Sequence, residues 1–158
     1  MTSVELATHD DIDRLVELEA ELFREDAGRH ERFVDVTWPD REGHGDFERL
    51  LANPSAVVLV ARAGTAVVGL AVGYLSQSAP TRLPVTYGVL RSVYVDVGHR
   101  DAGVGSQLVE AFIAWARAQG CAEAHVDSYV ANEGAQRFYD RHDFEPQSVS
   151  RVLRLSPS

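Results

Sequence analysis

The sequence predicts an α/β fold in which a mixed, largely antiparallel sheet contains one parallel pair of strands and is flanked by helices. Two β-branched runs, at 56–62 and 66–77, flank a short turn that contains glycine, which is typical of an antiparallel hairpin. A strand-like run at 85–97 is followed by an amphipathic helix and another strand at 121–130. Two strands joined by a crossover helix run parallel, so the chain combines both kinds of pairing.

The chain is expected to begin with a strand followed by a helix. Residues 4–7 read as the strand and residues 8–26 as the helix, because apolar residues recur there at helical spacing. Thr8 is the expected N-cap, and Asp11 stands where the acidic partner of a capping box belongs. Acidic residues occupy the other faces of this helix.

The segments that connect to the hairpin and lead away from it are less regular. Residues 27–45 are expected to be irregular, and a short helix at 46–53 is expected to stop at Pro54. After the hairpin, residues 78–84 are predicted to form a loop, since Ser, Pro and Thr gather there between two strand-like runs.

The second half of the chain is predicted to contain two helices and to close with a strand. The first helix, at 103–120, ends at Gly120, and the second, at 132–144, is capped by Asn132. The apolar face of the first helix consists of Leu108, Val109, Phe112, Ile113 and Ala116. Residues 148–155 are predicted to form the last strand.

Composition and charge exclude several classes of protein. A chain of 158 residues suits a single domain over 1–158, and no apolar stretch approaches the roughly 20 residues needed to cross a bilayer. Without an export signal and with a single cysteine, Cys121, we expect a cytoplasmic protein with no disulfide. The net charge of −9 argues against a nucleic-acid partner and favours a cationic one, although acidity also serves solubility. The six histidines show no metal-binding spacing, so no metal is expected.

A glycine-rich loop opens the helix at 103–120. Arg100, Gly103 and Gly105 form an R-x-x-G-x-G pattern directly after a strand. The first turn of a helix exposes N–H groups without internal partners, and glycine lets an anion approach them. The loop is therefore suited to a phosphate or diphosphate, while a tight turn without a ligand is the alternative.

Residues 85–145, with this loop and a downstream N-A-FY-F pattern (Asn132, Ala135, Phe138, Tyr139, Phe144), resemble the GNAT superfamily of acyl-CoA-dependent N-acetyltransferases. The resemblance implies that the strand before the loop splays from its parallel neighbour. Its freed backbone at Val93, Tyr94 and Val95 would then bind the pantetheine arm of acetyl-CoA. The residues implied to hold the diphosphate are Arg100, Asp101, Ala102, Gly103, Val104, Gly105 and Ser106. Asn132 is implied to contact the co-substrate, and its capping role explains it equally well.

The resemblance also assigns roles in the reaction. Tyr139 is the expected proton donor to the leaving thiolate, because a phenol stays protonated near neutral pH; packing in the core is the alternative. Asp127 is the expected base that deprotonates the amine, through a water if necessary, and a merely solvated carboxylate is equally compatible. His125 and Glu133 are weaker alternatives. Arg91 and Ser92 stand where many members carry an acid, so no base is expected on that strand.

Together these inferences predict an acetyl-CoA-dependent N-acetyltransferase. It would act on a primary amine of a small cationic molecule or a peptide, by direct attack in a ternary complex. The acidic residues expected to attract the acceptor are Glu17, Glu21, Glu25, Asp26, Asp35 and Asp40. The alternative is a catalytically inactive acyl-CoA-binding sensor or partner module. A homodimer through the last strand or the sheet edge is also compatible with the sequence.

Overall fold

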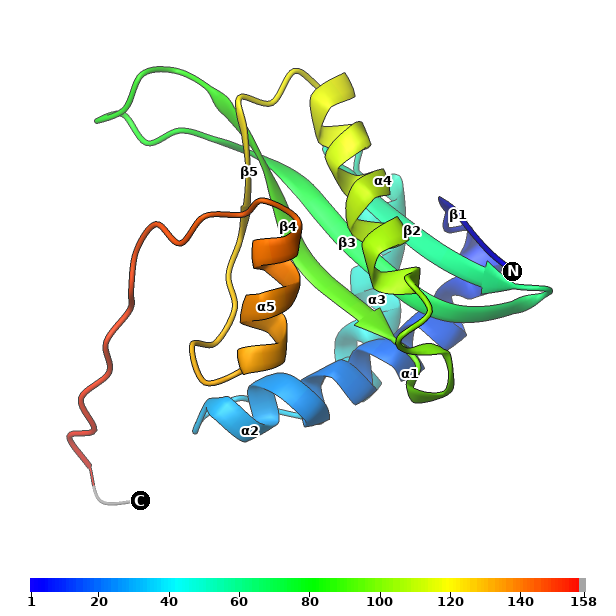
Figure 1. Cartoon of the computed structure of the whole chain (residues 1–158). Coiled ribbons are helices and arrows are strands. Elements are labelled where there is room, and N and C mark those ends of the chain that lie inside the picture. Colours follow the sequence, from blue (N-terminus) through cyan, green and yellow to red (C-terminus); the bar gives the residue numbers. More distant parts are fainter. Residues whose placement is uncertain (157–158) are drawn as a thin grey trace.

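The structure is a computed structural model that describes residues 1–156. One sheet contains five strands in the order β1-β2-β3-β4-β5 (Figure 1). Their bounds are Thr2–Leu6, Ala56–Ala63, Ala66–Gln77, Thr86–Val95 and Glu123–Val126. The first four strands pair antiparallel, whereas β4 and β5 pair parallel across the crossover helix. The predicted fold class, including the hairpin and the parallel unit, is confirmed.

Helices cover both faces of the sheet (Figure 1). Helices α1 (Ile12–Leu22) and α3 (Trp38–Ala52) lie on one face, and α4 (Val104–Ala118) and α5 (Glu133–Arg141) lie on the other. The shorter turns are η1 (His9–Asp11), η2 (Phe23–Ala27), α2 (Gly28–His30) and η3 (Val97–His99). No helix within residues 1–156 is both long enough and apolar enough to cross a membrane.

The first helix begins as predicted and runs further than predicted. The Thr8 N–H donates to Asp11 Oδ2 at 2.9 Å, which forms the expected capping box. Instead of ending at residue 26, the helix widens into the π turn η2 and continues through α2 to His30. This widened turn sets the direction in which the residues of η2 project.

The prediction of an irregular segment over 27–45 is wrong, because α3 already starts at Trp38. The Thr37 N–H donates to Asp35 Oδ1 at 2.9 Å, and Pro39 lies in the first helical turn, where its missing N–H costs nothing. Gly43 of α3 lies against α1. A Cβ at Gly43 would come within 3.2 Å of Val16 Cγ2, so glycine permits the two helices to approach closely there.

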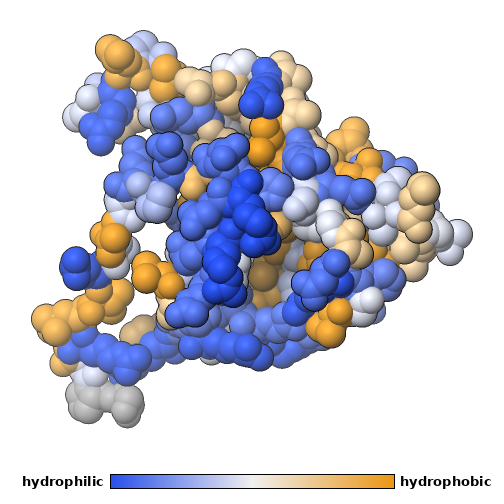
Figure 2. Space-filling model, viewed as in Figure 1, coloured by the Kyte–Doolittle hydropathy of each residue, from blue (hydrophilic) through white to orange (hydrophobic). Residues whose placement is uncertain are grey.

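The strand predicted at 148–155 is not formed. Residues 144–155 adopt neither helix nor strand. They leave the end of α5 and run away from the sheet (Figure 1). Figure 2 shows hydrophobic surface along this segment. Alternating apolar residues favour a strand, but a strand also requires a neighbour for its backbone hydrogen bonds, and among the described residues this segment pairs with none.

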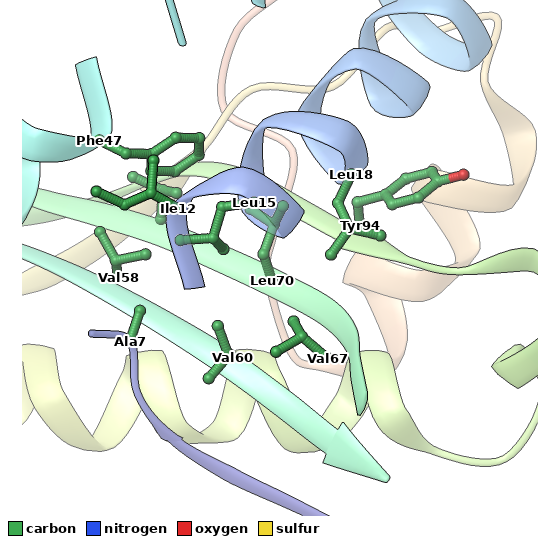
Figure 3. Packing of buried hydrophobic residues seen from close by; sticks show 11 residues of the cluster. Ala7, Ile12, Leu15, Leu18, Phe47, Val58, Val60, Val67, Leu70 and Tyr94 are labelled. Atoms are coloured by element: carbon green, nitrogen blue, oxygen red, sulfur yellow. The ribbon is translucent and has the colours of Figure 1, made fainter. Parts of the chain in front are cut away.

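Two apolar layers pack against the sheet. Val58 and Val60 of β2 point toward α1 and α3, where Leu15 and Phe47 are fully buried (Figure 3). The alternate residues of β2 point toward α4, whose buried face includes four of the positions predicted for it: Leu108, Val109, Phe112 and Ala116. Because both faces of the central strands are covered, the sheet forms a rigid middle layer from which β4 and β5 extend.

Candidate active site

The two parallel strands separate beside the cavity. Pairing between β4 and β5 ends at Leu90 and Val126, whereas β4 continues to Val95. Arg91 is an extra residue in β4, because Leu90 pairs with Gly73 while Ser92 pairs with the preceding residue of β3. Such a bulge bends a strand. A cavity of about 500 Å³ lies here, lined by the η2 and α2 segment, β4, Arg100, the end of β5 and the first turns of α5.

The backbone N–H and C=O groups of β4 point alternately toward β3 and toward the space where β4 and β5 separate, called here the splay. The Asp96 N–H donates to Val68 O at 2.8 Å, and alternate residues of a strand turn their backbone groups the same way. The backbone of Tyr94 therefore faces β3, while the groups of Val93 and Val95 face the splay. From the sequence we expected the main chain of Tyr94 to bind the pantetheine arm, but this main chain faces β3 instead. The phenol of Tyr94 donates to Glu25 Oε1 at 3.0 Å.

The glycine loop has the conformation that a ligand cradle requires. Gly103 caps α4 with φ +81°, and a Cβ at this position would meet nothing within 4 Å. Asp101 also has a positive φ, of 62°. The first-turn N–H groups of Val104, Gly105 and Ser106 have no partner within the helix. N–H groups of this kind can bind an anionic group such as a diphosphate. Residues 101–106 are not among those that line the cavity, whereas Arg100 is.

The guanidinium of Arg100 contacts other groups of the protein. Its Nη2 is 2.7 Å from Glu25 Oε2, and its Nε donates to Val95 O at 2.9 Å. The guanidinium also lies over the ring of Tyr94, at 5.1 Å from its centroid. In this conformation Arg100 bridges η2 and β4 at the edge of the cavity, and its contact with phosphate stays a prediction.

Asn132 and Asp26 connect the start of α5 to η2. The predicted cap is confirmed, because Asn132 Oδ1 accepts from the Ala135 N–H at 3.0 Å. The side-chain amide donates to Asp26 Oδ1, also at 3.0 Å. Both ends of this amide therefore have protein partners, and the contact fixes the Asp26 carboxylate beside the cavity.

Tyr139 and Asp127 line the same cavity from different elements. Burial, with a smaller contribution from Asp26, raises the pKa of Tyr139 to about 12. The phenol is therefore neutral throughout the ordinary pH range. Asp127 follows the last residue of β5 and is exposed. Glu133 also lines the cavity, whereas His125 is not among its lining residues and lies beside Glu123 at 3.1 Å.

The six acidic residues predicted to attract an acceptor do not lie together, and neither Asp35, which pairs with Arg41, nor Asp40 is among the residues that line the cavity. Glu25 and Asp26 line the cavity. Glu17 and Glu21 instead pair with arginines of the same helical segment, at 2.9 and 2.5 Å. The sequence could not distinguish them, because the direction of each side chain depends on the π turn. Arg29 and His30 also line the cavity and were missed, since their segment was expected to be irregular.

A partly buried ion-pair network includes Arg91, which also lines the cavity. Arg91 Nη2 is 3.0 Å from Glu19 Oε1 and 3.0 Å from Asp46 Oδ2. Burial raises the pKa of Glu19, while the nearby Arg91 guanidinium opposes this shift. Glu19 was not predicted to matter, because it falls within an apparently amphipathic helix. The pairing holds the Arg91 side chain between α1 and α3, which keeps the β4 bulge in place.

These features define an α/β protein with a splayed parallel pair beside a glycine-opened helix. The model of the family described as Acetyltransferase (GNAT) family matches residues 12–144. The chain belongs to this family, as its motifs indicated. No curated protein sequence matches the chain.

Solved structures share the fold along nearly the whole chain. A mutant of the BH1408 protein from Bacillus halodurans has a TM-score of 0.82 at 21% identity, covering 98% of this chain and 99% of that one. The aminoglycoside N-acetyltransferase AAC(6')-Iy in complex with CoA has a TM-score of 0.80 at 19% identity, covering 98% and 94%. An aminoglycoside acetyltransferase from an uncultured soil metagenomic sample reaches 0.71 at 21% identity, covering 98% and 97%. At these identities the likeness concerns the fold.

Proposed function

We propose that this single-domain chain transfers an acetyl group from acetyl-CoA to a primary amine of a small cationic molecule or a peptide. The observation that carries the proposal is the open, glycine-capped start of α4 next to the freed backbone of β4. Gly103 provides a start of α4 without a Cβ, and Val93 and Val95 turn their backbone groups away from β3. The carbonyl of Val95 accepts from Arg100 Nε, so it becomes available only when Arg100 moves. Family membership and the CoA complex of AAC(6')-Iy support the same co-substrate.

The residues that would hold acetyl-CoA form one continuous path. The main-chain N–H groups of residues 101–106 would bind the diphosphate, and the arginine at 100 would join them after leaving Glu25. Val93 and Val95 would bind the pantetheine amides as a neighbouring strand would. When bound, acetyl-CoA supplies an activated acyl thioester.

Tyr139 would stabilise the departing thiolate by donating a hydrogen bond. Its pKa of about 12 lies well above that of an ordinary thiol, near 8.5, so the phenol keeps its proton. Donation from a neutral, mostly buried hydroxyl still lowers the energy of a developing negative charge. We therefore assign hydrogen-bond stabilisation, rather than complete proton transfer, to Tyr139.

Asp127 would accept the proton of the acceptor ammonium. Its exposed carboxylate lies at the end of β5, on the cavity that Tyr139 lines from α5. Cys121 is absent from the residues that line this cavity, and burial raises the pKa of its thiol. A cysteine nucleophile is better as a thiolate, so direct attack by the amine is the simpler route.

The acceptor side of the cavity carries four carboxylates: Glu25, Asp26, Asp127 and Glu133. Arg29, Arg91 and Arg100 also line the cavity, so its four carboxylates exceed its three guanidinium groups by one charge. Arg91 and Arg100 have acidic partners. A cationic amine complements this arrangement. The similar fold of AAC(6')-Iy bound to a bisubstrate analogue, CoA-S-monomethyl-acetylneamine, supports testing aminoglycoside-like amines first.

Release of free CoA thiol from acetyl-CoA, measured with polyamines, aminoglycosides and small peptides, tests the proposal. Tyr139→Phe should lower kcat by about 100-fold while leaving CoA affinity nearly unchanged. Tyr74→Phe, on β3 and away from the cavity, is the matched control and should behave as wild type. Binding of CoA without turnover of any amine would instead favour the sensor alternative.

A further inference from the structure

The start of α4 contacts the end of α5 through a pair of polar side chains. Ser106 is the third residue of α4, and His142 follows the last residue of α5 as its C-cap. Ser106 Oγ lies 2.9 Å from His142 Nε2. Both residues are partly buried, and their helices cover the same face of the sheet (Figure 1). His142 therefore touches the helical turn whose N–H groups would bind the diphosphate.

The imidazole of His142 is held by aromatic packing. Its ring centroid lies 4.9 Å from that of Phe138, at an interplanar angle of 57°. Phe138 also supports the glycine loop, because a Cβ at Gly105 would lie 3.4 Å from Phe138 Cε1. The His142 N–H donates to Tyr139 O at 3.1 Å. The ring of Phe138 thus packs against both the start of α4 and the imidazole, and it holds Nε2 beside Ser106.

The hydrogen bond between Ser106 and His142 can run in two directions. A neutral imidazole has one N–H donor and one acceptor nitrogen, and a hydroxyl can donate or accept. If Ser106 donates to Nε2, its only side-chain hydrogen is used within the protein. If the Nε2–H donates to Ser106 Oγ, the serine hydrogen is free for another acceptor. The oxygens of a diphosphate are acceptors at neutral pH, so a diphosphate next to Ser106 would select the second direction.

Neutral donors carry much of the binding that the start of α4 can offer to an anion. Arg100 pairs with Glu25 at 2.7 Å, and Asp101 adds a carboxylate to the loop itself. The first-turn N–H groups and the hydroxyl of Ser106 are uncharged. A hydroxyl that accepts a hydrogen bond from an imidazole becomes a stronger donor, because hydrogen bonds in a chain polarise one another. The direction of the Ser106 hydroxyl therefore matters more here than it would beside a cluster of free arginines.

We propose that His142 is a positioning residue of the co-substrate site: its Nε2–H donates to Ser106 Oγ and directs the serine O–H toward the diphosphate of CoA. This role rests on the proposed function, which places that diphosphate at the start of α4. His142 is not among the residues that line the cavity, so it acts apart from the acyl group and the amine. Its effect should therefore fall on CoA affinity and on the KM for acetyl-CoA, and leave kcat unchanged.

Calorimetry with CoA and pantetheine tests this role, because pantetheine lacks the diphosphate. His142→Phe keeps a ring against Phe138 but removes the donor, and it should weaken CoA binding about 10-fold. Its affinity for pantetheine should stay within about twofold of wild type. His142→Gln, whose amide nitrogen can replace Nε2 as a donor, should recover most of the loss. His44→Phe, at a mostly exposed position of α3, is the matched control and should keep both affinities.

A double-variant comparison shows whether His142 acts through Ser106. Ser106→Ala should also weaken CoA binding about 10-fold, and adding His142→Phe to it should cause no further loss. Losses that multiply in the double variant would overturn the proposal, as would equal losses of CoA and pantetheine affinity in His142→Phe. Because Ser106→Ala removes a single atom, a wild-type CoA affinity in that variant refutes the proposal whatever the folding of His142→Phe.

The same titrations separate this role from the proposed function. If wild type shows no heat with CoA, the proposed function fails and the role of His142 fails with it. If wild type prefers CoA to pantetheine and His142→Phe keeps that preference in full, only the role of His142 is refuted.

Discussion

Gly103 offers the sharpest test of the diphosphate cradle. Replacing Gly103 by Ala affects the free protein through its backbone alone, because the new Cβ meets no protein atom within 4 Å. A left-handed φ of +81° costs an alanine about 1–2 kcal/mol. For a domain of this size, such a loss lowers Tm by roughly 2–8 °C.

The effect on binding should be larger than this strain suggests. The Cβ would stand at the N-cap of α4, next in sequence to the main-chain N–H groups that would meet the diphosphate. Loss of one hydrogen bond to a charged group costs about 1.5–3 kcal/mol, which corresponds to about 10- to 150-fold in affinity. Calorimetry with CoA measures this loss directly.

Gly64→Ala is the matched control. Gly64 lies in the turn between β2 and β3 and also has a positive φ, of 63°, and a Cβ there would likewise meet no atom within 4 Å. The two variants should therefore lose similar stability, but Gly64→Ala should retain full affinity for CoA. Equal affinities in the two variants would refute the reasoning.

Three further changes probe the surroundings of the site. Glu25→Gln should free Arg100 and raise CoA affinity about two- to fivefold at low salt; an unchanged affinity by calorimetry would rule out competition between Glu25 and the ligand. Because burial raises the folded-state pKa of Glu19, wild type should lose stability relative to Glu19→Gln as pH rises above about 4.5, and urea unfolding at several pH values checks this sign. Gly73→Ala would place a Cβ 2.5 Å from Phe112 Cε1 and should cost about 1–3 kcal/mol in urea unfolding, with partial recovery when Phe112→Leu is added.

The ends of helices could be predicted from the sequence where a single residue type determines the local backbone conformation. Glycine at the start and end of α4 predicted turns that have a positive φ at both Gly103 and Gly120. Asn132 was predicted as a cap and forms one. In each case the interaction lies within a few residues of the chain, so the sequence contains all the information required.

Structural features that depend on contacts between segments far apart in the sequence could not be predicted. The start of α3 was missed because this helix packs against α1, as at Gly43 and Val16, and the local sequence does not reveal that contact. The approach of Asp26 to Asn132 depends on the π turn and on the packing of α5, which no local pattern reveals. The predicted strand at 148–155 failed for a related reason: alternating apolar residues favour a strand, but they do not reveal whether another strand lies alongside, and none does among residues 1–156.

Binding of CoA compared with pantetheine tests the central claim most directly, because pantetheine lacks the diphosphate. If the N-terminal amides of α4 bind that group, calorimetry should show wild-type protein binding CoA at least about 100-fold more tightly than pantetheine, a difference of about 2.7 kcal/mol. Equal affinities for the two compounds, or no detectable heat with CoA at millimolar concentration, would contradict the account.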